Sequence, residues 1–245
     1  MARRWRAWHE RAEATGDEIV LDEEEGHHVL RVLRLRTGEP LSIFDGKGRE
    51  WAGTIVRAGS GEVAVRLEEE MTDAVECAVP VMLVQGLSRP ERLEWALEKA
   101  TEVGVRAIAL AACARSDGPL PSPARLARWR RVLLESCKQS GRRRIPDLFG
   151  PLPLGDAAAL GTGTRIVLVP GARPLIDALP GRPEAVALAV GPEGGFSEEE
   201  VDGLKVSGWS AASLGPRTLR TETAGPVAAA LVLHRWGDLG SAKPE

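Results

Sequence analysis

The chain has 245 residues, of which 43% are hydrophobic and 27% charged, with a formal net charge of -3. This composition can fill the core of one large or two modest domains and excludes a disordered chain. No segment reaches the run of about 18 apolar residues that a membrane helix needs, so we expect a soluble, cytoplasmic protein. Cys77, Cys113 and Cys137 lie far apart, without a C-x-x-C pair or clustered histidines. The sequence therefore predicts neither a disulfide framework nor a metal site.

Residues 1–72 have the pattern of a small β-rich domain. A turn signal at residues 45–48 separates two apolar runs, as in a hairpin, and a third run alternates between apolar and polar positions. The three expected strands cover residues 41–44, 50–56 and 63–67. Residues 27–36 instead have helical spacing, with Arg31 and Arg34 on the outer side. We therefore expect a small barrel that carries one helix.

In the second part, residues 73–245, short apolar runs alternate with longer segments of helical spacing. The expected strands are residues 79–84, 105–111, 165–169, 185–190 and 211–214. Such an alternation is typical of an α/β fold, in which helices cover both faces of a mostly parallel sheet. Ser88 and Glu91 have the spacing of a capping box, which predicts the start of the first of these helices.

The strongest functional signal is a pair of turn-rich segments, Gly191–Ser197 and Leu214–Thr223. Each follows a short apolar run and precedes a helical pattern, so each lies where a buried strand delivers its carboxyl end to a turn. Ligands bind at such places in open α/β sheets. The glycines of the first segment let a ligand approach the backbone, and Ser197 with Glu200 predicts a capping box for the next helix. No Gly-Lys-Ser/Thr closes the loop, so a nucleoside triphosphate is not expected.

For the first segment taken alone, a plain connection between strand and helix is an alternative of similar weight. The second segment favours a ligand site, because it carries Arg217, Arg220 and Glu222 in a turn between two buried elements. A helix start explains part of it: Thr221 or Thr223 could be the N-cap, and Glu222 would favour the helix dipole. A helix start does not explain the two arginines, so the sequence favours a site.

Motifs along nearly the whole chain resemble one known family. These are HHVLRVLRLR, IFDGKG, LEWALEKATEVGV, CKQSGRRRIP, GPEGGFSEEE, LGPRTLRTETA and HRWGDLG, in that order. They are similar to those of the ribosomal RNA small subunit methyltransferase E family, a branch of the SPOUT methyltransferases. The resemblance implies transfer of a methyl group from S-adenosylmethionine to N3 of a uridine in 16S ribosomal RNA. It also implies a PUA-like RNA-binding barrel over residues 1–72, a C-terminal trefoil knot in residues 73–245, and a homodimer.

Within that resemblance, the expected cofactor-binding residues are Val169, Gly191, Pro192, Glu193, Gly194, Gly195, Leu214, Gly215, Leu219 and Thr223. The uridine must be unpaired or flipped, because N3 is otherwise engaged in base pairing. As N3 loses its proton, charge spreads to the flanking carbonyl oxygens, and a guanidinium aimed there would stabilise it. Arg220 is our candidate for this catalytic role. Glu222 would either orient Arg220 or accept the proton.

Basic residues are unevenly distributed in spite of the negative net charge. Between residues 120 and 150 there are eight basic residues against two acidic ones, which suits RNA, although a solvated face is the alternative for each basic group. The expected phosphate contacts are Arg3, Arg4, Arg31, Arg34, Arg142, Arg143 and Arg144. The expected partner is 16S ribosomal RNA or the small ribosomal subunit.

Two other functions remain open at this point: a non-catalytic RNA-binding or ribosome-assembly protein of the same fold, and an enzyme that modifies a transfer RNA base or ribose. The chain also departs from the family pattern in two places. Gly225-Pro226 follows Thr223-Ala224, so the last helix should begin near Thr223 or bend at Pro226. Pro170-Gly171 stands where many relatives carry polar or acidic residues, which affects one expected cofactor contact.

Overall fold

The computed structural model describes residues 5–12, 15–59, 62–73, 75–117, 119–179, 181–237 and 239–240. The chain divides into two compact units. The first contains the chain up to Glu76 together with Cys137–Ile145, and the second contains Cys77–Ser136 and the chain from Pro146 onward. The sequence pattern places the border after residue 72 and treats both parts as continuous. In the structure a segment from the middle of the chain joins the first unit.

The first unit is built on a five-stranded sheet. Its strands are β1 (Arg6–Trp8), β2 (Glu18–Val20), β3 (Ser42–Phe44), β4 (Glu50–Gly59) and β5 (Glu62–Glu70), in the order β1-β3-β4-β5-β2. The predicted hairpin is confirmed, since β3 and β4 pair antiparallel with Ile43 opposite Trp51. Asp45 shapes the turn, because its Oδ1 accepts hydrogen bonds from three successive backbone N–H groups, those of residues 47 to 49. Alternate side chains of β5 fill the core.

The predicted helix of the first unit forms with shifted ends. It consists of α1 (Glu23–His27) and a π-helical turn, η1 (His28–Leu33). Asp22 starts it by accepting a hydrogen bond from the Glu25 N–H, and it ends at Arg34, whose φ is 58°. Arg31 and Arg34 are exposed, as the spacing predicts.

Buried ion pairs explain why the segment Cys137–Ile145 belongs to the first unit. Glu50 accepts from Arg6 Nε at 2.8 Å with one carboxylate oxygen and from Arg143 Nε at 3.0 Å with the other. Arg142 Nη2 lies 2.8 Å from Glu76 Oε2. A buried charge is costly unless it is paired and hydrogen-bonded. These pairs therefore attach the arginines to carboxylates that lie far away in the sequence.

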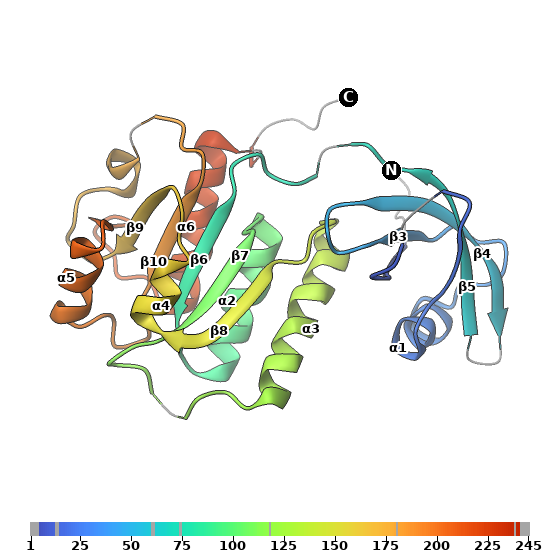
Figure 1. Cartoon of the computed structure of the whole chain (residues 1–245), viewed down its shortest axis with the longest axis horizontal. Coiled ribbons are helices and arrows are strands. Elements are labelled where there is room, and N and C mark those ends of the chain that lie inside the picture. Colours follow the sequence, from blue (N-terminus) through green and yellow to red (C-terminus); the bar gives the residue numbers. More distant parts are fainter. Residues whose placement is uncertain are drawn as a thin grey trace. The chain divides into compact units, whose positions relative to one another are not determined.

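The second unit contains a six-stranded parallel sheet. Its strands are β6 (Val81–Gly86), β7 (Ala107–Ala112), β8 (Asp147–Pro153), β9 (Thr164–Leu168), β10 (Val186–Val190) and β11 (Ser210–Ala212). Their order is β11-β9-β10-β6-β7-β8 (Figure 1). The five predicted strands are confirmed. The strand β8 was not predicted, because its sequence DLFGPLP contains Gly and two Pro residues and has no apolar run; as expected for such a strand, it lies at the sheet edge.

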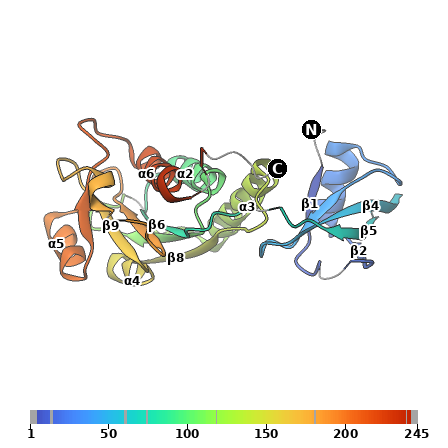
Figure 2. The ribbon, with the colours of Figure 1, turned by 90° about the horizontal axis from the view of Figure 1, so that it is seen from above.

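Helices cover both faces of this sheet, as predicted. The helices of this unit are α2 (Pro90–Val103), α4 (Leu154–Ala159), α5 (Glu198–Val206) and α6 (Thr221–Trp236), with a short 3-10 helix, η2 (Leu175–Ala178). A further helix, α3 (Pro123–Ser140), begins in this unit, and its last residues belong to the first unit. Figure 2 shows α2 and α6 on one face and α4 and α5 on the other. The α/β class is therefore confirmed. Among the described residues, no helix combines the length and the apolar character that crossing a membrane requires.

The two predicted capping boxes have different outcomes. At α5 the box is present, since Ser197 Oγ accepts from the Glu200 N–H and Glu200 Oε2 accepts from the Ser197 N–H. At α2 the prediction is wrong. The helix begins one residue later, with Arg89 as N-cap and Pro90 in the first turn, and Ser88 makes no capping bond. Proline fits the first helical position, because the N–H that it lacks has no partner there in any case.

The last helix begins at Thr221, two residues earlier than predicted, and continues through Pro226. The helix α6 contacts both β6 and β10, and Gly225 lies so close to the sheet that an added Cβ would be 2.9 Å from Leu83. The glycine of the unusual Gly225-Pro226 pair therefore lets α6 approach the sheet. The trefoil knot stays a prediction.

Candidate functional site

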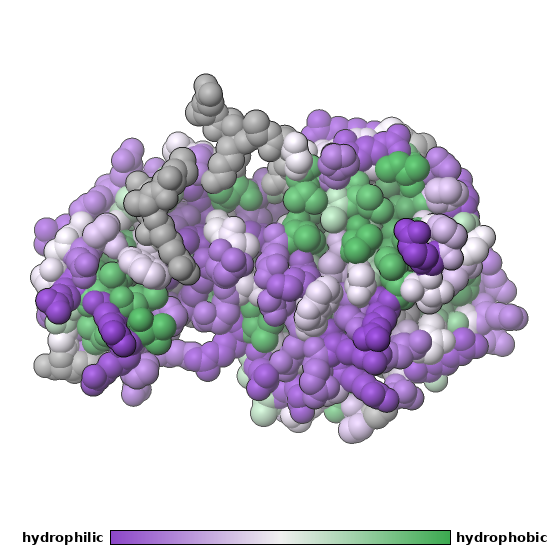
Figure 3. Space-filling view, turned by 180° about the vertical axis from the view of Figure 1, so that it is seen from behind, coloured by the Kyte–Doolittle hydropathy of each residue, from purple (hydrophilic) through white to green (hydrophobic). Residues whose placement is uncertain are grey.

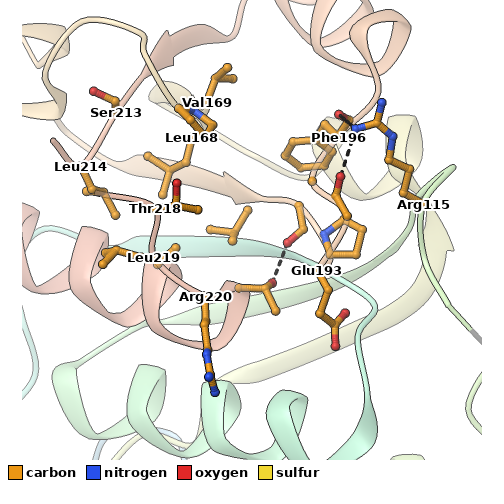
Figure 4. Close-up of a pocket in the computed structure, with 18 of the residues that line it drawn as sticks. Arg115, Leu168, Val169, Glu193, Phe196, Ser213, Leu214, Thr218, Leu219 and Arg220 are labelled. Carbon is orange, nitrogen blue, oxygen red and sulfur yellow. Dashed lines mark hydrogen bonds between the residues drawn. The ribbon is translucent and has the colours of Figure 1, made fainter. Parts of the chain in front are cut away.

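A cavity of about 510 Å³ lies at the carboxyl ends of the parallel strands of the second unit. Small-molecule sites typically have about 300–1,000 Å³. The segments that follow β9, β10 and β11 line it, from Leu168, Val190 and Ser213 onward (Figure 4). The two turn-rich segments that the sequence singles out thus meet in one cavity.

Nearly all the expected cofactor-binding residues line this cavity. They are Val169, Gly191, Pro192, Glu193, Gly194, Gly195, Leu214, Gly215 and Leu219. Thr223 does not line it, although Thr221 and Ala224 of the same turn of α6 do; the Thr223 N–H bonds to the Arg220 carbonyl. Of the two catalytic candidates, Arg220 lines the cavity and Glu222 does not.

A buried threonine ties the two segments together. Thr221 Oγ1 donates to the Gly191 carbonyl at 2.6 Å and accepts from Gln85 Nε2 at 2.9 Å. Gln85 is fully buried at the end of β6. The start of α6, the loop after β10 and the end of β6 are therefore joined by one short chain of hydrogen bonds, which fixes one wall of the cavity.

Two arginines that the sequence did not mark also line the cavity. Arg115, which follows β7, donates through Nη1 to the carbonyls of Gly194 at 3.0 Å and Phe196 at 3.2 Å. Arg92, on α2, places Nη1 3.5 Å from Glu193 Oε1. Both residues come from elements without a ligand-binding motif, and no local pattern distinguishes them from other surface arginines. Only the fold brings them to this loop.

Part of the glycine content of the loop has an intramolecular cause. A Cβ on Gly191 would lie 2.8 Å from the Gly195 carbonyl carbon, and one on Gly86 would lie 2.6 Å from the Pro192 nitrogen. Gly195 and Gly215 have positive φ values of 70° and 106°, which other residues rarely adopt. The glycines therefore let backbone segments pack against one another as well as leaving room for a ligand.

The arginine and the acid at the start of α6 face each other loosely. Arg220 Nη1 lies 4.0 Å from Glu222 Oε1, at the limit of an ion pair. The Arg220 side chain is 76% exposed, whereas that of Glu222 is 12% exposed. In Figure 4 the Arg220 side chain extends away from Leu168 and Val169. Its guanidinium is thus accessible to a ligand that enters the cavity from solvent.

The expected phosphate contacts fall into three groups. Arg3 and Arg4 lie outside the described residues. Arg31 and Arg34 are exposed and Arg144 is half-buried. For the remaining pair, Arg142 and Arg143, the structure corrects the predicted role in phosphate binding. Each of these two residues is only 4% exposed, and their guanidiniums bond to carboxylates of the same unit, so they serve the internal ion-pair network and are not available to RNA.

The thiols of Cys113 and Cys137 have no sign of nucleophilic chemistry. Burial raises the pKa of Cys113 to about 12, with a further contribution from the Glu200 carboxylate, and burial also raises the pKa of Cys137 to about 12. A thiol with such a pKa is protonated at neutral pH and is a poor nucleophile. Among the described residues, no three His, Cys, Asp or Glu side chains come together as a metal site would need.

Two family models match the chain. An RNA methyltransferase domain matches residues 75–233, and an RNA methyltransferase PUA domain matches residues 21–68. Ribosomal RNA small subunit methyltransferase E of Mycobacterium bovis is 34% identical over 236 residues, which cover 91% of this chain and 89% of the relative. The protein of the same name from Buchnera aphidicola subsp. Schizaphis graminum is 28% identical and covers 90% of this chain and 92% of the relative.

Solved structures agree over almost the full length. Ribosomal RNA small subunit methyltransferase E of Neisseria gonorrhoeae, crystallised with S-adenosylmethionine, superposes with a TM-score of 0.90 at 30% identity, covering 96% of this chain and 99% of that one. A putative methyltransferase of Legionella pneumophila, in complex with the same cofactor, gives a TM-score of 0.91 at 32% identity. It covers 97% of this chain and 100% of that one.

Proposed function

Because this chain belongs to the ribosomal RNA small subunit methyltransferase E family, we propose that it transfers a methyl group from S-adenosylmethionine to N3 of a uridine in 16S ribosomal RNA. The observation that carries the proposal is the shared cavity of the two turn-rich segments, which Arg220 lines together with nine of the expected cofactor-binding residues.

The lining of the cavity suits S-adenosylmethionine. Leu168, Val169, Leu214 and Leu219 supply apolar contacts for an adenine ring, and the loop Gly191–Gly195 brings backbone groups to the same space. A sulfonium cofactor supplies an activated methyl group whose leaving group is a neutral thioether. The protein then has little acid-base chemistry to perform on the donor, so positioning matters most. A rigid wall of backbone groups, held by Thr221 and Arg115, meets that need.

The acceptor requires more help, since the N3 proton of uridine is only weakly acidic. We assign to Arg220 the stabilisation of the charge that develops on the uracil carbonyl oxygens. Glu222 lies 4.0 Å from this guanidinium and does not line the cavity, so we assign to it the weaker role of orienting Arg220 through its charge. Thr223 belongs to the first turn of α6 and supports the site without touching the cofactor.

We further propose that residues 1–72 form the RNA-binding domain and residues 73–245 the methyltransferase domain. The phosphate contacts assigned to the first domain are Arg31 and Arg34 of the exposed helical turn, together with Arg3 and Arg4, while Arg144 adds a half-buried cation in the first unit. Replacing any one of these arginines with alanine should flatten the salt dependence of RNA binding, because fewer counterions are then released.

A homodimer is part of the same proposal. Figure 3 shows hydrophobic residues gathered on the face of the second unit that carries α2 and α6. Leu231 of α6 is 41% exposed and Trp95 of α2 is 44% exposed. Exposed apolar surface of this kind marks association sites. Light scattering of the wild type and of the variant Leu231→Glu would test it, with a monomer expected only for the variant.

Mass spectrometry of 16S ribosomal RNA tests the catalytic proposal directly. Small subunits and free RNA from cells that lack this protein are incubated with the protein and S-adenosylmethionine, and the modified nucleotide is mapped. We expect one uridine to gain a methyl group at N3. Transfer to another RNA, to a ribose, or to no RNA at all although S-adenosylmethionine binds would contradict the proposal.

A further inference from the structure

The cavity has two chemically different sides. Figure 4 shows Leu168, Val169 and Leu214 on one side, whereas the side chains of Glu193 and Arg220 extend away from them. The charged side chains among the described lining residues are Arg92, Arg115, Glu193, Arg217 and Arg220. Four guanidiniums thus accompany a single carboxylate. S-adenosylmethionine itself carries a net positive charge, so this excess of positive charge is suited to an anionic second ligand.

We propose that Arg92 contacts a phosphate of the substrate RNA next to the target nucleotide, and that Glu193 is the positioning residue that holds the Arg92 guanidinium at the cavity. The inference rests on the proposed function, because it names the group that receives the RNA backbone at the same site. It adds to Arg220, which faces the base, a second arginine that faces the backbone.

The contacts of Arg92 leave its guanidinium available. The structure gives it one hydrogen bond to the described residues, from Nη1 to Glu193 Oε1 at 3.5 Å, and its side chain is 34% exposed. A guanidinium has five N–H donors. The remaining donors form the kind of planar fork that binds phosphate oxygens in pairs. Arg115, in contrast, already donates to two carbonyls of the loop.

Glu193 is fixed more firmly than an ordinary surface carboxylate. Its Oε1 accepts the Arg89 N–H at 3.1 Å, so it binds the start of α2, which has no side-chain cap of its own. Its Oε2 is buried and has no hydrogen-bond partner among the described residues. Buried carboxylate oxygens are normally paired. The Glu193 carboxylate therefore attracts a nearby cation strongly, and the Arg92 guanidinium is such a cation. Glu193 therefore links α2 to the cavity loop and directs Arg92 from there.

The test uses the full-length protein with S-adenosylmethionine and the 16S substrate, and compares wild type with Arg92→Ala, Arg92→Lys, Glu193→Gln and the double variant R92A/E193Q. We expect Arg92→Ala to raise KM for RNA about tenfold or more, the size of one charged hydrogen-bond contact. The slope of log KM against log salt should also fall by about 0.7 to 0.9. The affinity of Arg92→Ala for S-adenosylmethionine, measured by calorimetry, should stay within about threefold of that of the wild type. Arg92→Lys keeps the charge, so it should recover the salt slope and part of KM.

The Glu193 variants separate positioning from plain stability. Glu193→Gln should raise KM for RNA in the same direction as Arg92→Ala, and the double variant should be no worse than Arg92→Ala alone. Arg182→Ala is the matched control, because Arg182 is exposed and does not line the cavity; it should leave KM and the salt slope unchanged. An unchanged KM in Arg92→Ala, or a loss of cofactor affinity as large as the rise in KM, would overturn the inference, as would additive effects in the double variant. If the wild type itself transfers no methyl group to 16S RNA, the proposed function fails first.

Discussion

The hydroxyl of Thr221 and the carbonyl of Gly191 are 2.6 Å apart, and this hydrogen bond joins the first residue of α6 to the loop after β10. Because Gln85 donates to the same hydroxyl from the end of β6, the bond belongs to a buried chain of three residues. The Thr221 hydroxyl is therefore the central link of this chain, which helps to fix one wall of the proposed cofactor cavity.

Replacing Thr221 with Val should weaken cofactor binding and stability together. The change keeps the shape and removes the hydroxyl, so the Gly191 carbonyl loses its partner and Gln85 keeps only the Gly86 carbonyl at 3.3 Å. An unpaired buried polar group costs about 1–3 kcal/mol. Calorimetry with S-adenosylmethionine and thermal unfolding would measure both effects. Thr221→Ser retains the hydroxyl and should behave like the wild type; equal losses in both variants would remove the hydrogen bond from the explanation.

Replacing Arg220 with Ala should strongly lower kcat and spare cofactor binding. If the guanidinium stabilises charge on the uracil, its loss should lower kcat by about 10²–10³, the effect of removing one such donor. Its side chain is 76% exposed, so the fold does not depend on it. Single-turnover methyl transfer to 16S RNA and calorimetry with S-adenosylmethionine would separate the two. Arg220→Lys should recover part of kcat, since it restores charge without the planar fork. A normal kcat in the alanine variant would exclude Arg220 from the mechanism.

Replacing Gly86 with Ala should displace the loop Gly191–Gly195 and so weaken cofactor binding. The added Cβ would lie 2.6 Å from the backbone nitrogen of Pro192, so the loop must shift. Such overpacking costs roughly 1–3 kcal/mol, and cofactor affinity should fall with stability. Gly203→Ala is the control, because Gly203 lies inside α5 with open space around it; there the change should stabilise the protein by roughly 0.5–1 kcal/mol. Chemical denaturation of both variants would decide, and an unaffected Gly86→Ala would show that the loop tolerates displacement.

The ion-pair network of the first unit should make this unit sensitive to acid. Burial raises the pKa of Glu50, but the hydrogen bonds and charge of Arg6, with Ser42 and Arg143, outweigh it and lower the pKa below its ordinary value of 4.5. A carboxyl whose pKa is lowered by folding contributes stability that is present above about pH 4.5 and is lost as the pH falls through the folded-state pKa.

Glu50→Gln should therefore destabilise the protein at pH 7 by about 3–5 kcal/mol, the cost of breaking a buried pair. The difference from the wild type should shrink as the pH is lowered from about 5 to about 3. Thermal unfolding over this range measures it. Glu70→Gln serves as the control, because Glu70 forms an exposed pair with Arg49 and should change stability little at any pH. A constant difference between Glu50→Gln and wild type across the range would contradict the assignment.

Much of this protein is readable from the sequence, because the signals are local. Hydrophobic runs predict five of the six strands of the second unit, turn chemistry predicts the β3–β4 hairpin, and the spacing of Ser197 and Glu200 predicts the start of α5. Since parallel strands all end at one edge of a sheet, the two turn-rich segments could also be expected to meet. The edge strand β8 and the exact starts of α2 and α6 were missed, because proline and glycine in these segments break the local pattern.

The surroundings of the charged side chains, and so their roles, were decided only by the tertiary structure. Arg142 and Arg143 look like RNA contacts in the sequence, yet the carboxylates of Glu76 and Glu50 neutralise them in the interior. Arg92 carries no motif, yet α2 brings it to Glu193 at the cavity. From the sequence one can read which residues are charged and at what spacing apolar residues recur. Whether a charge meets solvent, RNA or a buried partner depends on residues that are distant in the chain, because electrostatic energies are set by distance and burial in the folded state.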